Sequence, residues 1–410
     1  MEKLNLFLKN NSYESLFIVF VLGGYVVASG LAIPLGIENS RLFAVPYRVL
    51  IFLMSLYFIF KGIKEKKINI AVVSTIAFWL FYVVKNYYSL TNHYYKQEIL
   101  PSLQESYVRI FVIALIPSLA LLNLNFKKID LRKTGKILFL IYFLMLFFNT
   151  VYGIFHIQNG VMGHIFSIYY ISYGHLGTSL VLMSTYFLFF TEPKKRDKFI
   201  YGLGLLLGLF IIIEGFARSP FLALVVVSVY YLVVLKKEKY FYFFITFMLF
   251  IISYIYLSEK YGFNRLIFIE RTYNWIFNGD TSLRMPLFEK GWNIFRENPI
   301  LGGRVLFEDG MYPHNIFLEL LMATGIIGFV LYMLKYVPLV KSWKFFFCKK
   351  KDSGEILFFA LFLQYFVLVC TSYSLYSTPE FLHLSAVIIA LSLYFIYEKT
   401  KSNDRRWDAS

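Results

Sequence analysis

Charged side chains inside or beside long apolar stretches are the residues of this sequence best suited to chemistry. Such a charge at the centre of a membrane helix costs about 2.5–3.5 kcal/mol, so it usually marks a function. Arg218 lies in EGFARSPFLALVV and Arg284 in TSLRMPLFEKGW. A guanidinium has paired donors that match phosphate oxygens, so both are candidates for binding a phosphorylated ligand. Arg48 and Arg109 are weaker candidates of the same kind.

Each of the two arginines also has a structural interpretation. Arg218 is spaced to form an i,i+4 ion pair with Glu214, or to extend its side chain to lipid headgroups. Arg284 falls on a segment that predicts an amphipathic helix, where an arginine usually belongs to the solvated face. The residue pattern alone leaves both alternatives open.

A second group of polar residues precedes the apolar stretch that runs to residue 334. His314 has a reference pKa of about 6.5, so it is able to accept a hydroxyl proton near neutral pH. Asn315 is a typical helix-start residue, and the positive end of a helix dipole favours a bound anion. Glu319, one turn further, is either an orienting partner or a buried protonated acid. The structural alternative for His314 is a polar residue near a helix cap.

The remaining histidines give no metal motif. His156, His164 and His175 flank an uncharged segment, but their spacing matches no ligand set and no carboxylate accompanies them. We interpret these three as polar loop residues and assign no role to His93 or His383. No metal and no cofactor is therefore expected.

The elements that must position these residues are membrane helices. Of the 410 residues, 58% are hydrophobic and 16% are charged, against about 45–50% and 25% in an ordinary soluble domain. This composition excludes both a soluble globule and a disordered chain. The net charge of +16 comes mainly from Lys and Arg clusters between apolar runs, which indicates membrane topology rather than nucleic-acid binding.

We predict an all-α polytopic membrane protein with about twelve transmembrane helices, because a span needs about 20 apolar residues. The predicted spans are 16–33, 43–60, 68–84, 107–124, 137–156, 175–191, 199–213, 219–235, 240–257, 315–334, 356–374 and 381–397. Lys and Arg gather in alternate loops, which places both termini in the cytoplasm and the site residues on the outer side. Residues 1–410 are interpreted as one integral-membrane domain.

The predicted outer loop 258–313, before the tenth span, is long for a structureless connection. Loops of that length are usually functional or carry helices of their own. The stretch SLRMPLFEKGWNIF, which includes Trp292, predicts a short amphipathic helix on the membrane surface or over a cavity.

Three segments, in this order and on one predicted side of the membrane, resemble the O-antigen ligase and polymerase superfamily of bacterial membrane proteins. They are ARSP at 217–220, SLR at 282–284 leading to NPILGG at 298–303, and HN at 314–315 followed by GIIG at 325–328. The resemblance covers about residues 200–335, an O-antigen ligase-like core. It departs from the family at Ala217, where Ser is usual, and at Pro220.

The resemblance implies a glycosyltransferase of the inner cell membrane that moves a glycan from undecaprenyl pyrophosphate to an acceptor hydroxyl, with inversion at the anomeric carbon. Arg218 and Arg284 would neutralise the pyrophosphate leaving group without a metal, and His314 would act as general base or orient the acceptor. Substrate binding is assigned to Glu214, Asn315 and Glu319. The expected partners are the lipid-linked glycan, the acceptor and the bilayer.

Two reactions share this donor. A ligase uses lipid A–core or a similar acceptor, and the long loop before His314 favours it; an O-antigen or capsular polysaccharide polymerase adds repeat units on the same carrier. The alternative of another class is a twelve-span transporter or a lipid-linked glycan flippase. FKGIKEKKIN at 60–69 lacks the Gly-x-x-x-Asp-Arg pattern of such transporters, and a flippase would place charges in a central cavity.

Overall fold

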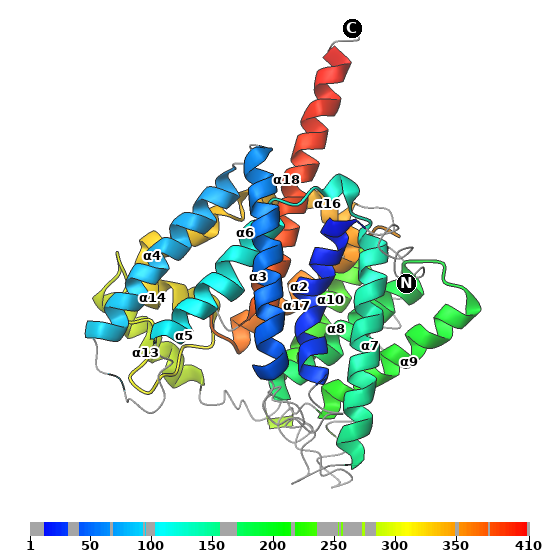
Figure 1. The fold of residues 1–410 in the computed structure, drawn as a ribbon. Coiled ribbons are helices and arrows are strands. Elements are labelled where there is room, and N and C mark those ends of the chain that lie inside the picture. The colour runs from blue at the N-terminus through cyan, green and yellow to red at the C-terminus, as the bar shows by residue number, and fades with distance from the viewer. Residues whose placement is uncertain are drawn as a thin grey trace.

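The structure, a computed structural model, describes residues 12–31, 41–65, 69–92, 95, 103–155, 170–214, 218–235, 253, 256, 273–274, 284–348, 352–375 and 378–407. Every regular element in these residues is a helix, which confirms the all-α prediction (Figure 1). The helices are α2 (Tyr13–Gly30), α3 (Arg41–Lys64), α4 (Ile70–Asn92), α5 (Leu103–Val108), the π-helix η1 (Arg109–Leu115), α6 (Ile116–Leu122), the 3-10 helix η2 (Phe126–Lys128), α7 (Leu131–Phe155), α8 (Tyr170–Phe189), α9 (Lys195–Glu214), α10 (Arg218–Leu235), α13 (Arg284–Glu297), α14 (Ile316–Leu334), α15 (Val337–Ser342), α16 (Lys344–Phe347), α17 (Gly354–Thr371) and α18 (Pro379–Trp407).

Nine helical segments within the described ranges are long and apolar enough to cross a membrane. They are Tyr13–Gly30, Leu42–Lys64, Ile70–Asn92, Glu105–Leu122, Leu131–Gly153, Arg218–Leu235, Ile316–Leu334, Gly354–Thr371 and Pro379–Lys401. Each coincides with one of the twelve predicted spans. Their length and composition therefore agree with a multi-pass membrane protein.

The other three predicted spans have a different outcome. Those at 175–191 and 199–213 are helical, as parts of α8 and α9, but neither helix is apolar enough to be counted with the nine. Helix α9 begins with the charged run KRDK, and α8 carries buried Thr and Ser side chains. The span predicted at 240–257 lies outside the described residues apart from two positions. The number twelve stays a prediction.

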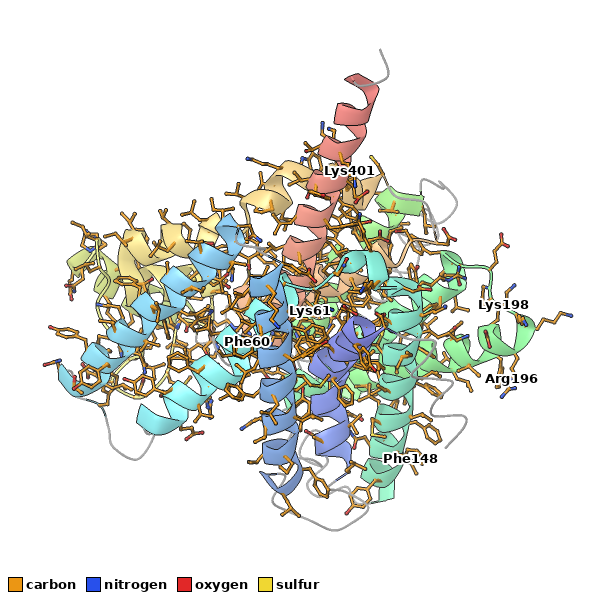
Figure 2. The ribbon with its side chains drawn as sticks, turned by 45° about the horizontal axis from the view of Figure 1, so that its top comes forward. Phe60, Lys61, Phe148, Arg196, Lys198 and Lys401 are labelled. Atoms are coloured by element: carbon orange, nitrogen blue, oxygen red, sulfur yellow. The ribbon has the colours of Figure 1, made fainter. Side chains whose placement is uncertain are left out.

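The centre of the bundle is formed by α17 and α18, each 72% buried along its apolar segment. Helix α17 packs against α7, α8, α10 and α18. By contrast, α3 is only 22% buried and exposes apolar side chains. Figure 2 shows Phe60 of α3 and Phe148 of α7 on the outside of the bundle, where they are 63% and 60% exposed. Apolar side chains in such positions are typical of a surface that faces lipid.

Small residues bring α8 and α9 into backbone contact. A Cβ atom built on Gly208 would lie 2.7 Å from the carbonyl oxygen of Gly177, and one on Gly204 would lie 2.8 Å from Ser184 Oγ. Membrane helices commonly pack this closely through small residues spaced four apart. The Gly204–Gly208 pair therefore serves the packing of α9 on α8.

The basic loops meet at one end of the bundle. Ion pairs join residues that flank different helices at this end: Lys127–Glu398 at 2.8 Å, Lys136–Asp197 at 3.1 Å and Arg132–Asp352 at 3.6 Å. The end of α17 and the start of α18 lie at the opposite ends of these two helices. Which end of the bundle faces the cytoplasm stays a prediction from the Lys and Arg counts.

The short helix predicted inside loop 258–313 is present as α13. Gly291 is its buried contact point, because a Cβ there would lie 2.9 Å from Pro313 Cγ and 3.4 Å from Leu318 Cδ2. Helix α13 therefore packs against the start of α14 rather than standing free. Most of residues 258–283 lie outside the described part of the chain.

Candidate active site

His314 occupies a strained position two residues before α14. Its φ of 56° places it in the left-handed region, and no other described residue except glycine has a positive φ. A histidine there costs about 1–3 kcal/mol, a strain that proteins tend to retain at functional sites. The Nδ1 atom bonds the backbone carbonyl of Ser372, directly after α17, and the Tyr312 ring stands 4.4 Å from the imidazole centroid.

The bond to Ser372 fixes which imidazole nitrogen is free. Because a carbonyl oxygen only accepts, Nδ1 carries the hydrogen and Nε2 of the neutral ring keeps its lone pair. Burial lowers the pKa of His314 below its ordinary 6.5; the Ser372 bond opposes this shift, and the positive charge of Arg284 adds to it. His314 is therefore neutral near pH 7, the state that a general base requires.

Asn315 caps α14. Its Oδ1 accepts hydrogen bonds from the Phe317 and Leu318 amides, both at 3.1 Å, and its Nδ2 donates to the carbonyl of Cys370 at 3.1 Å. An Asn side chain at this position satisfies amides that the helix itself leaves unbonded. These contacts hold α14 against the end of α17, and so fix the His314 backbone from both sides.

Glu319 is fully buried in α14. Its two carboxyl oxygens accept from the Leu375 amide at 3.1 and 3.0 Å. Leu375 belongs to the segment that follows α17 and carries Ser372. Glu319 thus bonds the segment that bears the His314 partner, and its role in the site stays a prediction.

Arg218 is the first residue of α10 and is half-buried. The next residue, Ser219, is buried and links two other elements: its Oγ lies 3.1 Å from His175 Nε2 and accepts from Ser372 Oγ at 3.3 Å. The start of α10, where Arg218 lies, is thereby held near the Ser372 segment that bonds His314. Glu214 and Arg218, the pair considered from their i,i+4 spacing, do not share a helix, because α9 ends at Glu214 and α10 begins at Arg218. The Glu214 side chain lies outside the described residues.

Arg284 is the first residue of α13 and also half-buried. After burial of the imidazole, the positive charge of Arg284 is a second cause that lowers the pKa of His314. The contact of Gly291 with Pro313 sets the distance between α13 and the His314 segment. The structure therefore brings Arg284 and His314 into electrostatic reach of each other, and it bonds Ser219, the residue after Arg218, to Ser372, whose carbonyl holds His314.

The segment after α13 forms hydrogen bonds with backbone groups that a break in α14 leaves unbonded. Gly325 departs from helical geometry at φ 62° and ψ −164°, which frees backbone groups on both sides of it. The segment 299–303 satisfies them: Ile326 N donates to Pro299 O at 2.9 Å, and Gly303 N donates to Met322 O at 2.8 Å. The two segments noted in the sequence, NPILGG at 298–303 and GIIG at 325–328, therefore pack against each other.

Sequence reasoning missed several residues of this region. His175 was expected in a loop, and this is wrong: α8 begins five residues earlier and buries the side chain, which is 1% exposed. Ser219 and Ser372 could not be recognised as site residues from the sequence, because serines are common in apolar helices. His93, His156 and His164 lie outside the described residues. In the part of the chain that the structure describes, no three His, Cys, Asp or Glu side chains cluster as metal ligands.

These features define an integral-membrane helical protein with a polar, arginine- and histidine-bearing site at one end of its bundle. Residues 203–333 match the family model described as O-antigen ligase, a range that contains Arg218, Arg284 and His314. This match supports assignment to the O-antigen ligase and polymerase superfamily and points to glycan transfer of ligase or polymerase type in lipopolysaccharide biosynthesis. No curated protein and no solved structure matches the chain.

Proposed function

We propose that the protein transfers a glycan from undecaprenyl pyrophosphate to an acceptor hydroxyl at the outer face of the inner membrane. The acceptor oxygen attacks the anomeric carbon, the bond to pyrophosphate breaks, and pyrophosphate leaves with the bonding electrons. The configuration at the anomeric carbon inverts. The observation that supports the proposal is that Arg218, Arg284 and His314 all lie within the family match, that the charge of Arg284 acts on His314, and that Ser219, next to Arg218, bonds Ser372.

In this mechanism the two arginines bind the leaving pyrophosphate. Guanidinium groups form paired, charge-assisted hydrogen bonds with phosphate oxygens and supply positive charge where negative charge develops. No metal is needed for this role. The position of Arg218 and Arg284 at the starts of α10 and α13 adds the positive ends of two helix dipoles.

His314 takes the proton of the acceptor hydroxyl through Nε2. The bond from Nδ1 to Ser372 orients the ring and stabilises the imidazolium that forms. Burial, together with the charge of Arg284, lowers the pKa of His314 and so keeps the base deprotonated before the reaction. Asn315 and Glu319 position this histidine, and their substrate-binding roles become indirect.

Deletion of the gene followed by electrophoresis of the surface polysaccharide tests the function. Loss of attachment with carrier-linked polymer retained identifies a ligase, which the long loop before His314 favours. Attachment of single repeat units identifies a polymerase. An unchanged polysaccharide profile in the deletion strain contradicts the proposal. Complementation with the gene should restore any lost product.

A further inference from the structure

Helices α4 and α14, both long and apolar enough to span a membrane, pack against each other in opposite directions. The ring centroids of Phe78 and Tyr332 lie 4.8 Å apart. One turn along, a Cβ atom on Gly328 would stand 3.0 Å from the ring of Phe81. Later residues of α14 therefore meet earlier residues of α4. The start of α14, beside His314, accordingly lies on the same side of the bundle as the end of α4.

Contacts with α4 give the depth of the segment between α13 and α14. The Gly302 carbonyl accepts from Lys85 Nζ at 2.8 Å. The Val305 amide donates to Ser89 Oγ, one turn nearer the end of α4, at 3.0 Å. Lys85 lies seven residues before that end at Asn92, about 10 Å at the helical rise per residue. The chain therefore reaches inside the length of a spanning helix at Gly302 and turns back toward its end at Val305.

The backbone of this segment is suited to a place without water. Non-helical backbone is tolerated at membrane depth only where its polar groups are bonded within the protein. Three carbonyl groups of the segment accept from protein donors: Pro299 O from Ile326 N at 2.9 Å, Ile300 O from Ile327 N at 3.3 Å, and Gly302 O from Lys85 Nζ at 2.8 Å. Pro299 itself has no N–H to satisfy. Lys85 is buried, although a lysine near the end of a membrane helix usually extends to the surface.

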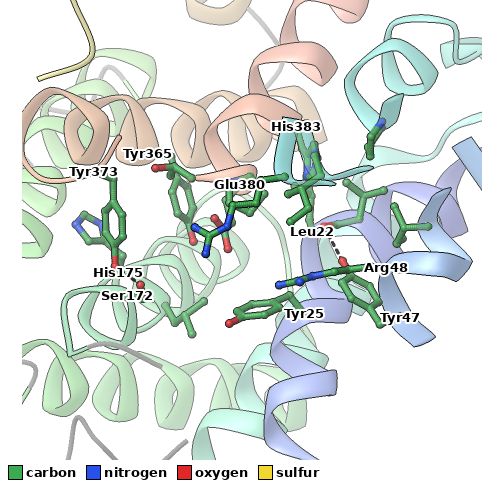
Figure 3. A pocket seen from close by; sticks show the side chains of 18 of the residues that line it. Leu22, Tyr25, Tyr47, Arg48, Ser172, His175, Tyr365, Tyr373, Glu380 and His383 are labelled. Carbon is green, nitrogen blue, oxygen red and sulfur yellow. Dashed lines mark hydrogen bonds between the residues drawn. The ribbon is translucent and has the colours of Figure 1, made fainter. Parts of the chain in front are cut away.

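The side chains at the turn of this segment are large, apolar and exposed. Ile300 and Leu301 are exposed, and so are three neighbours on α14, namely Ile326, Ile327 and Val330. The amides of Ile326 and Ile327 bond the turn, and Val330 follows Ile326 by one helical turn, so the five side chains form one apolar patch, the tip patch. None of them lines the cavity between α2, α3, η1, α8, α17 and α18 that Figure 3 shows. The tip patch therefore faces the outside of the bundle.

Aromatic and charged residues border the tip patch. The exposed Tyr87 and Tyr88 lie near the end of α4, and tyrosines are enriched where a membrane meets water. Before the turn, α13 ends at the exposed Glu297. After it, Arg304 pairs with the exposed Glu308 at 2.9 Å. An apolar turn between charged flanks is the pattern expected of a segment that enters lipid and returns to water.

We propose that residues 299–303 form a re-entrant loop, which inserts the tip patch among the acyl chains of the bilayer in the leaflet on the His314 side. Bulk lipid is the partner, because the patch has no charged side chain and is continuous with the apolar surface of α14. The loop 258–313, expected outside the membrane, thus contains a part that lies within it. Insertion sets the depth of α13, and therefore of Arg284, relative to the membrane surface. The proposal does not depend on the glycan-transfer function.

Labelling of single cysteines tests the insertion. The protein, with Cys348→Ser and Cys370→Ser, is placed as one copy per nanodisc of phosphatidylethanolamine and phosphatidylglycerol and treated with a charged, membrane-impermeant maleimide. Ile300 and the Glu308 side chain are similarly exposed, at 64% and 58%, so burial by protein alone predicts equal labelling of Ile300→Cys and Glu308→Cys. We expect Ile300→Cys and Leu301→Cys to react about tenfold more slowly or less, because hydrocarbon disfavours the reactive thiolate and excludes the reagent. After denaturation in SDS all three should label alike.

A nitroxide attached at the same positions gives a second measurement. Collisions with oxygen should exceed collisions with a water-soluble nickel chelate at Ile300→Cys and Leu301→Cys, and the order should reverse at Glu308→Cys. Leu53→Cys is the control for lipid exposure, since Leu53 is an exposed apolar residue in the middle of α3. Labelling of Ile300→Cys and Leu301→Cys at the rate of Glu308→Cys, with nickel collisions dominant, overturns the proposal. Slow labelling in native membranes that is lost in single-copy nanodiscs indicates a protein partner instead of lipid and also overturns it.

Discussion

Gly302 and Gly325 lie backbone to backbone. A Cβ atom on Gly302 would stand 2.4 Å from the Thr324 nitrogen, and one on Gly325 would stand 2.5 Å from the Gly302 nitrogen. Both residues also have positive φ, at 73° and 62°. Lys85 of α4 secures the same contact by donating from Nζ to the Gly302 carbonyl at 2.8 Å. This contact fixes the segment after α13 on α14, and with it the spacing of Arg284 and His314.

Replacement of either glycine by alanine is expected to destabilise the protein. The left-handed backbone alone costs a non-glycine residue about 1–2 kcal/mol, and the backbone overlap adds to this. Melting temperatures of Gly302→Ala and Gly325→Ala in detergent should fall clearly below the wild type. Gly202→Ala is the matched control: Gly202 lies in α9 with nothing within 4 Å of its Cβ position, so the variant should melt at or above the wild-type temperature. Wild-type melting of both test variants would contradict the contact.

The variant His314→Asn should remove the imidazole while keeping the left-handed backbone conformation at position 314. Asparagine tolerates the left-handed region, so the variant should fold and insert with a wild-type melting temperature. Glycan transfer should fall by about 10²–10⁴-fold, the usual contribution of a general base. Transfer at the wild-type rate would reassign His314 to a structural role.

The pH dependence of transfer should report the His314 imidazole. Protonation removes the base, and because the pKa of His314 is lowered, activity should be retained down to pH 6.5 and be lost only below it. Arg284→Gln removes a charge that lowers this pKa, so the residual activity should lose its acid limb at higher pH than the wild type. Arg284→Lys keeps the charge and should keep the midpoint. A wild-type midpoint above pH 7 is the result that contradicts this assignment.

Glu319→Ala should loosen the segment that holds Ser372. The change leaves the Leu375 amide without its acceptor, at a cost of about 1–3 kcal/mol, so we expect a lower melting temperature and a lower kcat. Glu319→Gln keeps one carbonyl oxygen and should lose less of both. Glu308→Gln, at an exposed site paired with Arg304, is the control. If Glu319→Ala melts and turns over as the wild type does, Glu319 does not position the site.

Removal of divalent cations should leave transfer intact. The two guanidinium groups supply the positive charge that a metal would otherwise provide. Purified protein dialysed against EDTA should retain its rate, with magnesium addition giving no stimulation. A strict metal requirement would contradict the arginine mechanism.

The sequence predicted the elements better than the contacts between them. Apolar length located nine spanning helices, and amphipathic spacing located α13, because both depend on local composition. The hydrogen-bond partner of His314 could not be predicted, because it is the backbone carbonyl of Ser372 and every residue type has such a carbonyl. The role of Lys85 could not be predicted either, because its partner Gly302 is 217 residues away.

The most direct test of the central claim is a transfer assay with purified protein, a lipid-linked glycan donor and its acceptor. Arg218→Lys and Arg284→Lys keep the charge but lose the paired hydrogen-bond donors. Each change should therefore slow transfer by about tenfold or more. The double variant combined with His314→Asn should give no product above the uncatalysed background, while Arg196→Lys on α9 should behave as the wild type. Normal product from the triple variant would contradict the account.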